Sequence, residues 1–288
     1  MPPSGAPYER KLVNTAFLKT TLLPMADAGV TFYDEHFKRG PDGKLLIQPA
    51  NAIEMFWKVR DPLPDIAGLR WVLQGLLDLP SHLTDPAARK RWQRLLGEVP
   101  EIPIGEVEGI RRILPYAPGQ QAGRHNSENP ELYAVYPFRL YGVGKPELPL
   151  AQATFTHRKY KKFGCWYQDA IQGALVGDAA TAQKGVIRNL TNRDSRMRFQ
   201  AFWAKGHDYI PDEDNGGNGL VALQQMLLQA DDWKILLLPA WPADWEAEFK
   251  LHAPGNTQIQ GRVSQGKVLD LKVTPEKRRA DIVFPAAR

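Results

Sequence analysis

The sequence changes character at Trp233-Lys234-Ile235-Leu236-Leu237-Leu238-Pro239. The apolar run within this stretch, ended by a proline, predicts a buried strand. After it, apolar and polar residues alternate with a period of two, between turn residues, over 248–251, 257–263, 266–273 and 280–284. This alternation is typical of strands. A small antiparallel β domain is therefore expected over residues 233–288.

The sequence before this stretch shows mainly helical periodicity. Apolar residues recur at three- and four-residue steps, which predicts a series of helices joined by loops rich in proline and glycine. The expected helices are 9–37 with a break near Pro24, 65–79 capped in part by Asp65, one opened by Asp85-Pro86, 106–114, 128–140, 148–158, 166–175, 179–190, 196–204 and 219–230. Helices followed by strands indicate a mainly α protein, with a helical domain over 1–232 and an appended β domain over 233–288.

Composition narrows the class of protein. A chain of 288 residues that is 43% hydrophobic can bury a large core, and its net charge of +5 is scattered in short groups. Scattered charge without a zinc finger or basic helix argues against a nucleic-acid partner. The single Cys165 excludes an internal disulfide. Neither an apolar run of about 18 residues nor a signal peptide is found, so no membrane association is expected and the compartment stays open.

Carboxylates gather in three segments that lie in or beside expected loops. Glu54 and Trp57 lie in the segment 48–57, and a cation, an imidazole and two acids lie in 124–133. The third segment, 212–219, places acids and glycines before an apolar helix. Apolar neighbours would raise the pKa of Glu54 and suit it to general acid catalysis. The alternatives are a Glu54 that points to water, Ser127 as a helix cap, and Asn215 or Asn218 as a helix cap.

Metal and cofactor chemistry finds little support in the motifs. The segment from Asp212 departs from a calcium loop, because Gly216 and Leu223 occupy ligand positions. The zinc, phosphate-loop and nucleophile-elbow motifs are absent from the sequence. No metal and no cofactor are therefore expected, and carboxylate chemistry remains.

Several segments, taken in order, resemble glycoside hydrolase family 95, the inverting α-L-fucosidases and α-L-galactosidases. The resemblance covers about residues 8–284, and its most specific part is the junction from helices to strands. It is carried by Asp42-Gly43-Lys44-Leu45, Pro49-Ala50-Asn51-Ala52-Ile53-Glu54, Arg124-His125-Asn126-Ser127, Leu132-Tyr133-Ala134-Val135-Tyr136-Pro137, Gly164-Cys165-Trp166, His207, Asp214 with Gly216-Gly217, Met226-Leu227-Leu228-Gln229, Ile235-Leu236-Leu237-Leu238-Pro239-Ala240-Trp241-Pro242 and Trp245.

The resemblance implies a fold and a reaction. The fold is an (α/α)6-type barrel closed by a small β domain, here incomplete because a leading β-sandwich and the first barrel helices would be missing. The reaction is inverting hydrolysis of a terminal α-L-fucoside or α-L-galactoside, which needs two opposed carboxyls roughly 6.5 to 9.5 Å apart. Glu54 would be the acid and Asp214 the base or its partner.

Other residues would bind the sugar. The implied substrate-binding residues are Trp57, Arg124, His125, Trp166, His207 and Asn215. Aromatic planes such as that of Trp57 suit stacking on the apolar face of a sugar ring. The expected partner is thus an oligosaccharide or polysaccharide. The alternatives are a non-catalytic carbohydrate-binding fragment of such a hydrolase, and a structural helical domain with an interaction role.

Overall fold

The chain forms two compact units, Met1–Leu140 and Tyr141–Arg288. The computed structural model describes residues 14–191, 198, 213–231 and 233–285. The domain boundary expected at residue 232 lies inside the second unit, where helices and strands share one compact body. The expected helix 196–204 lies outside the described residues apart from Arg198.

The first unit begins with one long helix. It comprises α1 (Thr15–Phe17), a π-helical turn η1 (Leu18–Leu22) and α2 (Leu23–His36). The break expected near Pro24 is therefore wrong. Pro24 has no N–H to donate, and a π turn immediately before it, closed by the Leu23 N–H on the Leu18 carbonyl, lets the helix continue.

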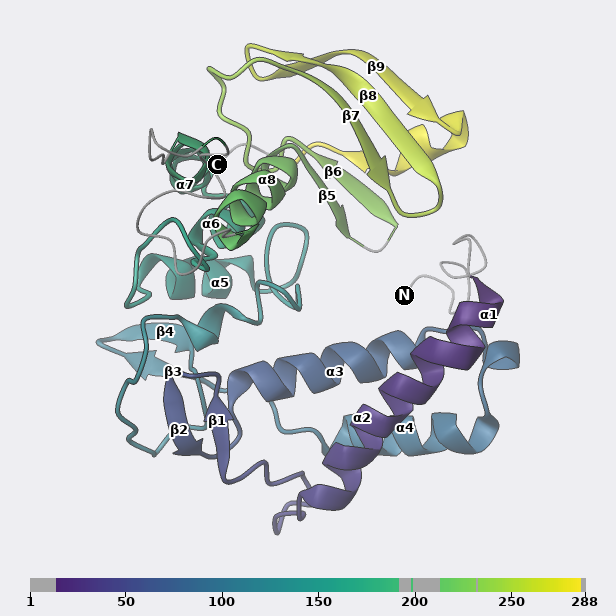
Figure 1. Cartoon of the computed structure of the whole chain (residues 1–288), viewed down its shortest axis with the longest axis vertical. Coiled ribbons are helices and arrows are strands. Elements are labelled where there is room, and N and C mark those ends of the chain that lie inside the picture. The colour runs from purple at the N-terminus through teal and green to yellow at the C-terminus, as the bar shows by residue number, and fades with distance from the viewer. Residues whose placement is uncertain (1–13, 192–197, 199–212, 232, 286–288) are drawn as a thin grey trace. The chain divides into compact units, whose positions relative to one another are not determined.

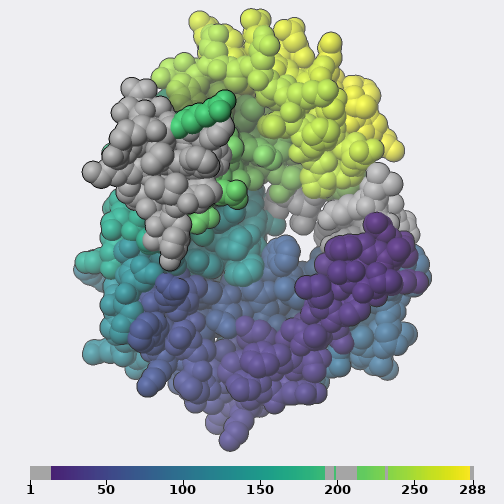
Figure 2. Space-filling model, viewed as in Figure 1, coloured from purple at the N-terminus to yellow at the C-terminus, as the bar shows by residue number. Residues whose placement is uncertain are grey.

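This first helix lies on the surface of its unit (Figure 2). One of its faces contributes Leu18 and Val30 to the core, while Phe17, Leu22, Met25 and Phe32 remain more than 40% exposed. The helix is thus only partly covered by its own unit.

Two further helices, α3 (Leu63–Leu77) and α4 (Pro86–Glu98), pack beside α2 (Figure 1). The start of α4 follows the sequence prediction, since the Asp85 carboxylate accepts the Ala88 N–H at 2.8 Å. The core that these helices enclose consists of Leu18, Val30, Phe37, Leu45, Ile47, Ile66, Leu69, Leu73, Leu76, Leu79, Trp92, Leu95 and Val99.

Asp65 does not cap α3, contrary to the prediction. The helix starts two residues earlier than expected, after Pro62, and has no side-chain cap. Asp65 instead accepts a hydrogen bond from the Tyr33 hydroxyl at 2.6 Å. A tertiary partner on α2 has therefore taken the carboxylate that the local pattern assigned to the helix end.

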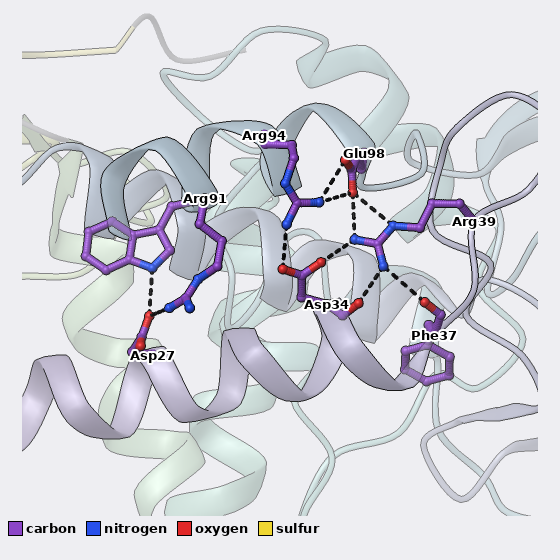
Figure 3. Close-up of polar contacts among 8 residues, drawn as sticks. Asp27, Asp34, Phe37, Arg39, Arg91, Arg94 and Glu98 are labelled. Atoms are coloured by element: carbon purple, nitrogen blue, oxygen red, sulfur yellow. Dashed lines mark hydrogen bonds and ion pairs between the residues drawn. The ribbon is translucent and has the colours of Figure 1, made fainter. Parts of the chain in front are cut away.

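Charged side chains fasten α2 to α4 (Figure 3). Arg39 and Arg94 both bind Asp34 and Glu98, with Arg94 Nη2 2.6 Å from Asp34 Oδ2 and Arg39 Nη2 2.7 Å from Glu98 Oε2. About two turns earlier on α2, Asp27 accepts from Arg91 and from the indole of the buried Trp92. We call this group of seven residues the α2–α4 clamp.

Two hairpins lie at the N-terminal end of α3 (Figure 1). They are β1 (Ala50–Ala52) with β2 (Phe56–Val59), and β3 (Ile104–Val107) with β4 (Ile110–Ile113), both antiparallel. The helix expected over 106–114 is therefore wrong. Glu108 and Gly109 both have positive φ, 54° and 74°, which forms the tight two-residue turn between paired strands.

The helix expected over 128–140 is also wrong. Its residues form a 3-10 turn, η3 (Pro130–Leu132), followed by further turns. Pro130 and Pro137 interrupt the segment, and each lacks the N–H that a continuing helix would need. Ser127 consequently caps no α-helix.

The second unit contains helices α5 (Leu148–Thr156), α6 (Asp169–Val176), α7 (Ala179–Thr191) and α8 (Glu213–Leu227). The predictions of α5 and α7 are close to the observed bounds. The start of α8 differs, because the glycine-rich segment 213–219 is helical and not a loop. A Cβ added at Gly219 would lie 3.1 Å from Asn189 Cβ, so this glycine serves the close packing of α8 against α7.

Strands follow α8 directly. β5 (Leu228–Asp231), β6 (Lys234–Leu237) and β10 (Ile282–Val283) form one small sheet, in which β10 runs parallel to β6. β7 (Ala247–Ala253), β8 (Thr257–Ser264) and β9 (Lys267–Thr274) form an antiparallel sheet in sequence order, and η4 (Glu276–Asp281) links it to β10. The predicted order of helices followed by a C-terminal β region is thus confirmed.

Candidate functional site

Two of the predicted acid-bearing segments come together in the first unit. The turn between β1 and β2 contains Glu54 and Met55, and the segment that starts at Arg124 runs alongside it. The His125 N–H donates to the Met55 carbonyl at 2.9 Å, and the Glu128 N–H donates to Met55 Sδ at 3.1 Å. Met55 is fully buried and therefore anchors both segments.

Trp57 and His125 form a stacked pair at this place. Their ring centroids lie 3.9 Å apart and their planes differ by 7°. The indole Nε1 donates to the Glu54 carbonyl at 3.1 Å, which fixes the ring against the turn. Trp57 is nevertheless 50% exposed, so the pair presents a fixed aromatic surface to solvent. We call it the Trp57–His125 plate.

Glu54 lies beside this plate, but in an exposed position. Its Oε2 accepts a hydrogen bond from Asn126 Nδ2 at 2.9 Å. The apolar setting expected for Glu54 is therefore wrong. Its neighbours Met55 and Phe56 turn into the core, and the carboxyl at the tip of the turn remains in contact with water.

Two further acids follow in the second segment. Glu128 is half-buried, and burial together with the charge of Glu54 raises its pKa. Glu131 is 7% exposed, and burial raises its pKa against the opposing effects of its own backbone N–H and of Arg124 and Arg112. Both acids are thus biased toward the protonated form.

Arg124 completes this group. Its guanidinium lies over the Phe56 ring, with Cζ 4.8 Å from the ring centroid. Its charge also acts on Glu131. The structure therefore brings four predicted residues into one group on the first unit: Glu54, Trp57, Arg124 and His125.

The other predicted residues belong to the second unit, and His207 lies outside the described residues. Asp214 is exposed in the first turn of α8. Asn215 is fully buried, and its Nδ2 donates to the Asn189 carbonyl at 2.9 Å while Asn189 Nδ2 donates back to the Asn215 carbonyl at 3.2 Å. Asn215 therefore joins two helices and does not cap α8.

Trp166 lies in a loop that packs against the start of α8. Asn218 Nδ2 donates to the carbonyls of Cys165 and Tyr167, on either side of Trp166, at 3.0 and 3.3 Å. Asn218 thus joins α8 to this loop and is not a cap. Within the described part of the chain, the Trp166 indole Nε1 is buried and has no hydrogen-bond partner.

Asn126, Glu128 and Glu131 were not predicted as site residues. A signal was present, because the run Arg124-His125-Asn126-Ser127-Glu128 contains five polar residues in succession. The residue types alone assign these side chains no role. In the turns that form, the Glu128 N–H contacts Met55 and the Asn126 amide contacts Glu54.

The described residues contain no cluster of His, Cys, Asp and Glu that could hold a metal ion. Among the helices of the described ranges, none has the length and apolar character that crossing a bilayer requires. The sequence matches no model of a known protein family, and no curated protein matches it significantly.

Proposed function

We propose that this chain is a glycoside-hydrolase-like protein that binds the end of an oligosaccharide or polysaccharide at the Trp57–His125 plate. The reaction is inverting hydrolysis of a terminal α-L-fucoside or α-L-galactoside, as the resemblance to glycoside hydrolase family 95 implies. The same resemblance gives Glu54 the role of general acid and Asp214 that of the base or its partner, and it implies a fold of the (α/α)6-barrel type.

The main support for this proposal is the Trp57–His125 plate, with the carboxyl of Glu54 held beside it. A rigid, half-exposed indole offers a flat apolar surface on which the C–H face of a sugar ring can stack. Asn126 holds the Glu54 carboxyl at the edge of that surface. A sugar stacked on Trp57 would therefore have polar groups of Glu54 and Asn126 within reach of its hydroxyls.

A second function, carbohydrate binding without hydrolysis, is favoured by one observation. Glu54 and Asp214 are both exposed. A general acid is usually a buried carboxyl, and neither of these two carboxyls is buried. A protein with the plate and without a working acid would bind sugars and leave them intact.

Two measurements on the full chain test the proposed function. The first is the release of 4-nitrophenol from α-L-fucoside and α-L-galactoside substrates, and the second is calorimetric titration with fuco- and galacto-oligosaccharides. Trp57→Ala is expected to weaken binding by roughly tenfold, since about 1.4 kcal/mol of stacking is lost. Trp71→Ala is the matched control, because Trp71 on α3 is exposed to a similar degree, 54%, and does not belong to the proposed site.

The outcomes separate the two functions. Hydrolysis by the parent that is lost in Glu54→Gln and in Asp214→Asn supports the hydrolase. Binding without hydrolysis, still dependent on Trp57, supports the binding protein. Neither binding nor hydrolysis, or equal loss of binding in Trp57→Ala and Trp71→Ala, would contradict both.

A further inference from the structure

The first helix of the chain has an outer face without charges. Between Lys19 and Glu35, the exposed residues of this helix are all uncharged: Thr20, Leu22, Pro24, Met25, Ala28, Gly29 and Phe32. A helix face that meets water usually carries charged and polar side chains. The outer face of this helix therefore has the composition of a surface that becomes buried, although its own unit leaves it open.

The largest exposed side chains of the helix lie in one stripe. Phe32 follows Met25 by seven residues and Gly29 follows it by four, so the three share a face. The extra residue in the π turn brings Phe17, eight residues before Met25, onto the same face. Met25 is 71% exposed, and Phe17 and Phe32 are 54% and 53% exposed. We call this face the Met25 stripe.

Gly29 lies within the Met25 stripe, in the interior of α2. Glycine is among the least favourable residues for a helix interior. A Cβ added at Gly29 would meet no atom within 4 Å, so packing inside its own chain does not explain the glycine. A glycine on an open helix face allows a second element to approach the backbone closely.

Large and small residues alternate along the stripe. In chain order it consists of Phe17, Thr21, Met25, Ala28 with Gly29, Phe32 and His36. If a second copy of the helix lies antiparallel, with the two-fold axis at the level of residues 26 and 27, Met25 faces Ala28 and Phe32 faces Thr21. Each large side chain then meets a smaller one, as close packing of two helices requires. A parallel pair would instead place each large side chain against its own equivalent.

Charge and area both bear on such a pair. Two copies of the stripe do not repel each other, because its exposed residues between Lys19 and Glu35 carry no charge. The overlap of residues 17–36 is about 30 Å long and about 10 Å wide, which gives an area on the order of 300 Å² on each copy. A standard stable interface buries about 800 Å² on each partner. The stripe alone therefore supports a weak dimer that depends on concentration.

We propose that the Met25 stripe binds a second copy of this chain as an antiparallel helix pair. Met25 of each copy packs against Ala28 and Gly29 of the other. Because the same surface is used on both copies, the contact closes after two chains. The inference does not depend on the proposed glycosidase activity, and neither one fails with the other.

The first experiment measures self-association of the full chain by sedimentation velocity, over concentrations from about 1 to about 500 μM that cover weak association. The weight-average sedimentation coefficient of the parent is expected to rise with concentration. Met25→Asp is expected to weaken association by about tenfold or more, because the contact would bury a carboxylate. Leu220→Asp is the matched control, since Leu220 on α8 is 52% exposed and does not belong to the stripe.

Gly29→Gln separates the stability of the helix from the contact. At about 1 μM its thermal midpoint is expected to lie above that of the parent, because glutamine is the better helix former. At high concentration its association is expected to be weaker by about tenfold, because the new side chain fills the space for the partner's Met25. Gly75→Gln is the control: Gly75 also lies inside a helix, with no atom within 4 Å of an added Cβ, and association should be unchanged.

Cross-linking tests the antiparallel arrangement. Thr21→Cys and Phe32→Cys are mixed and oxidised with copper phenanthroline; the native Cys165 is buried and is kept. A disulfide-linked dimer is expected from the mixture, with little from either variant alone. The mixed pair keeps one Phe32–Thr21 contact with its native residues. Efficient cross-linking of Thr21→Cys to itself would indicate a parallel pair and overturn the proposal.

Two further results would overturn it. One is a parent protein that stays monomeric at every concentration; a thermal midpoint lowered much more by Met25→Asp than by Leu220→Asp would then indicate that another segment of the same chain covers the stripe. The other is self-association that survives Met25→Asp, or that Leu220→Asp weakens equally. Circular dichroism of each variant shows whether its fold is intact.

Discussion

Tyr33 and Asp65 form a hydrogen bond between α2 and α3, with the hydroxyl 2.6 Å from the carboxylate. Burial raises the pKa of Tyr33, and the charge of Asp65 and its hydrogen bond raise it further. Burial also raises the pKa of Asp65, and the hydroxyl of Tyr33 opposes this effect. The hydrogen bond from Tyr33 therefore stabilises the ionised form of the buried Asp65 carboxyl.

Tyr33→Phe is expected to lower the free energy of unfolding by roughly 1 to 3 kcal/mol at pH 7, because the buried carboxylate loses its donor. The pKa of Asp65 is higher in the folded protein than in the unfolded chain, where it is 3.8. Asp65 therefore contributes stability at a pH below 3.8, and this contribution is lost as the pH rises through its folded-state pKa. The loss in Tyr33→Phe should therefore be smaller at pH 4 than at pH 7 in urea unfolding.

Asp65→Asn provides the control for this prediction. With no carboxyl to ionise, the effect of Tyr33→Phe measured in the Asp65→Asn background should be nearly independent of pH. An effect of Tyr33→Phe that is the same at pH 4 and at pH 7 in the parent background would contradict the proposed coupling.

The site shows what residue types alone can and cannot predict. Glu54, Trp57, Arg124 and His125 could be singled out because they lie in short polar segments that resemble those of a known family. The structure brings these segments together, since the His125 N–H donates to the Met55 carbonyl, and their role in sugar binding stays a prediction. The sequence could not show that Glu54 is exposed and Glu128 half-buried, because burial depends on how the turn directs each side chain.

At the scale of elements, the α2–α4 clamp joins two helices that are far apart in the sequence (Figure 3). Burial raises the pKa of Asp34 and of Glu98, but hydrogen bonds from Arg94 and Arg39 outweigh it, and both values are lowered. Because the pKa values of Asp34 and Glu98 are lower in the folded protein than in the unfolded chain, both carboxyls stabilise the unit at a pH above their unfolded-state pKa. This stabilisation disappears as the pH falls through their folded-state pKa values.

We therefore expect the free energy of unfolding to fall as the pH drops from about 5 to about 2. Asp34→Asn should cost roughly 1 to 3 kcal/mol at pH 7, because hydrogen bonds to two guanidinium groups are weakened, and should reduce this acid dependence. Guanidinium or urea titrations at several pH values measure both quantities.

Glu35→Gln is the matched control for the clamp. Glu35 is the next residue on α2, it is exposed, and it is not part of the clamp. An equal loss of stability in Glu35→Gln and Asp34→Asn would indicate that net charge, and not the clamp, is responsible.

Elements were predicted well where a local signal had no competitor. The Asp85-Pro86 start of α4 is such a case, since its cap is formed within one turn of helix. Predictions failed where a tertiary contact used the same residue. Asp65 binds Tyr33, and the glycines and asparagines of 215–219 pack and bond against neighbouring segments, so α8 begins before the apolar run that marked its expected start.

On the scale of the whole molecule, the division into Met1–Leu140 and Tyr141–Arg288 could not be predicted from the pattern of elements. The change from helices to strands at Trp233 is a change in local periodicity, whereas a compact unit is defined by its core. One core is built from residues between Leu18 and Val99, and another from residues between Leu227 and Val273, so strands and part of α8 share a core.

The first unit has its own core and the complete Trp57–His125 plate, so we expect residues 1–140 to fold when expressed alone. The fragment should unfold cooperatively in urea, with an m value of roughly 1 to 3 kcal/mol per molar. Circular dichroism and two-dimensional NMR measure this, and Trp57→Ala in the fragment should change the signals of His125. A fragment that shows neither dispersed NMR signals nor a cooperative unfolding transition would contradict the expectation that this unit folds alone.

The π turn Leu18–Leu22 fixes the length of the chain before Pro24. Because this turn holds one residue more than an α-helical turn, deleting Thr21 would restore ordinary α-helical bonding. The residues on either side of the turn would keep their faces of the helix, because the π turn absorbs the extra residue and its removal only narrows the turn. Leu18, only 3% exposed, would therefore keep its place in the core. A one-residue deletion here would thus repair the helix without moving its anchor.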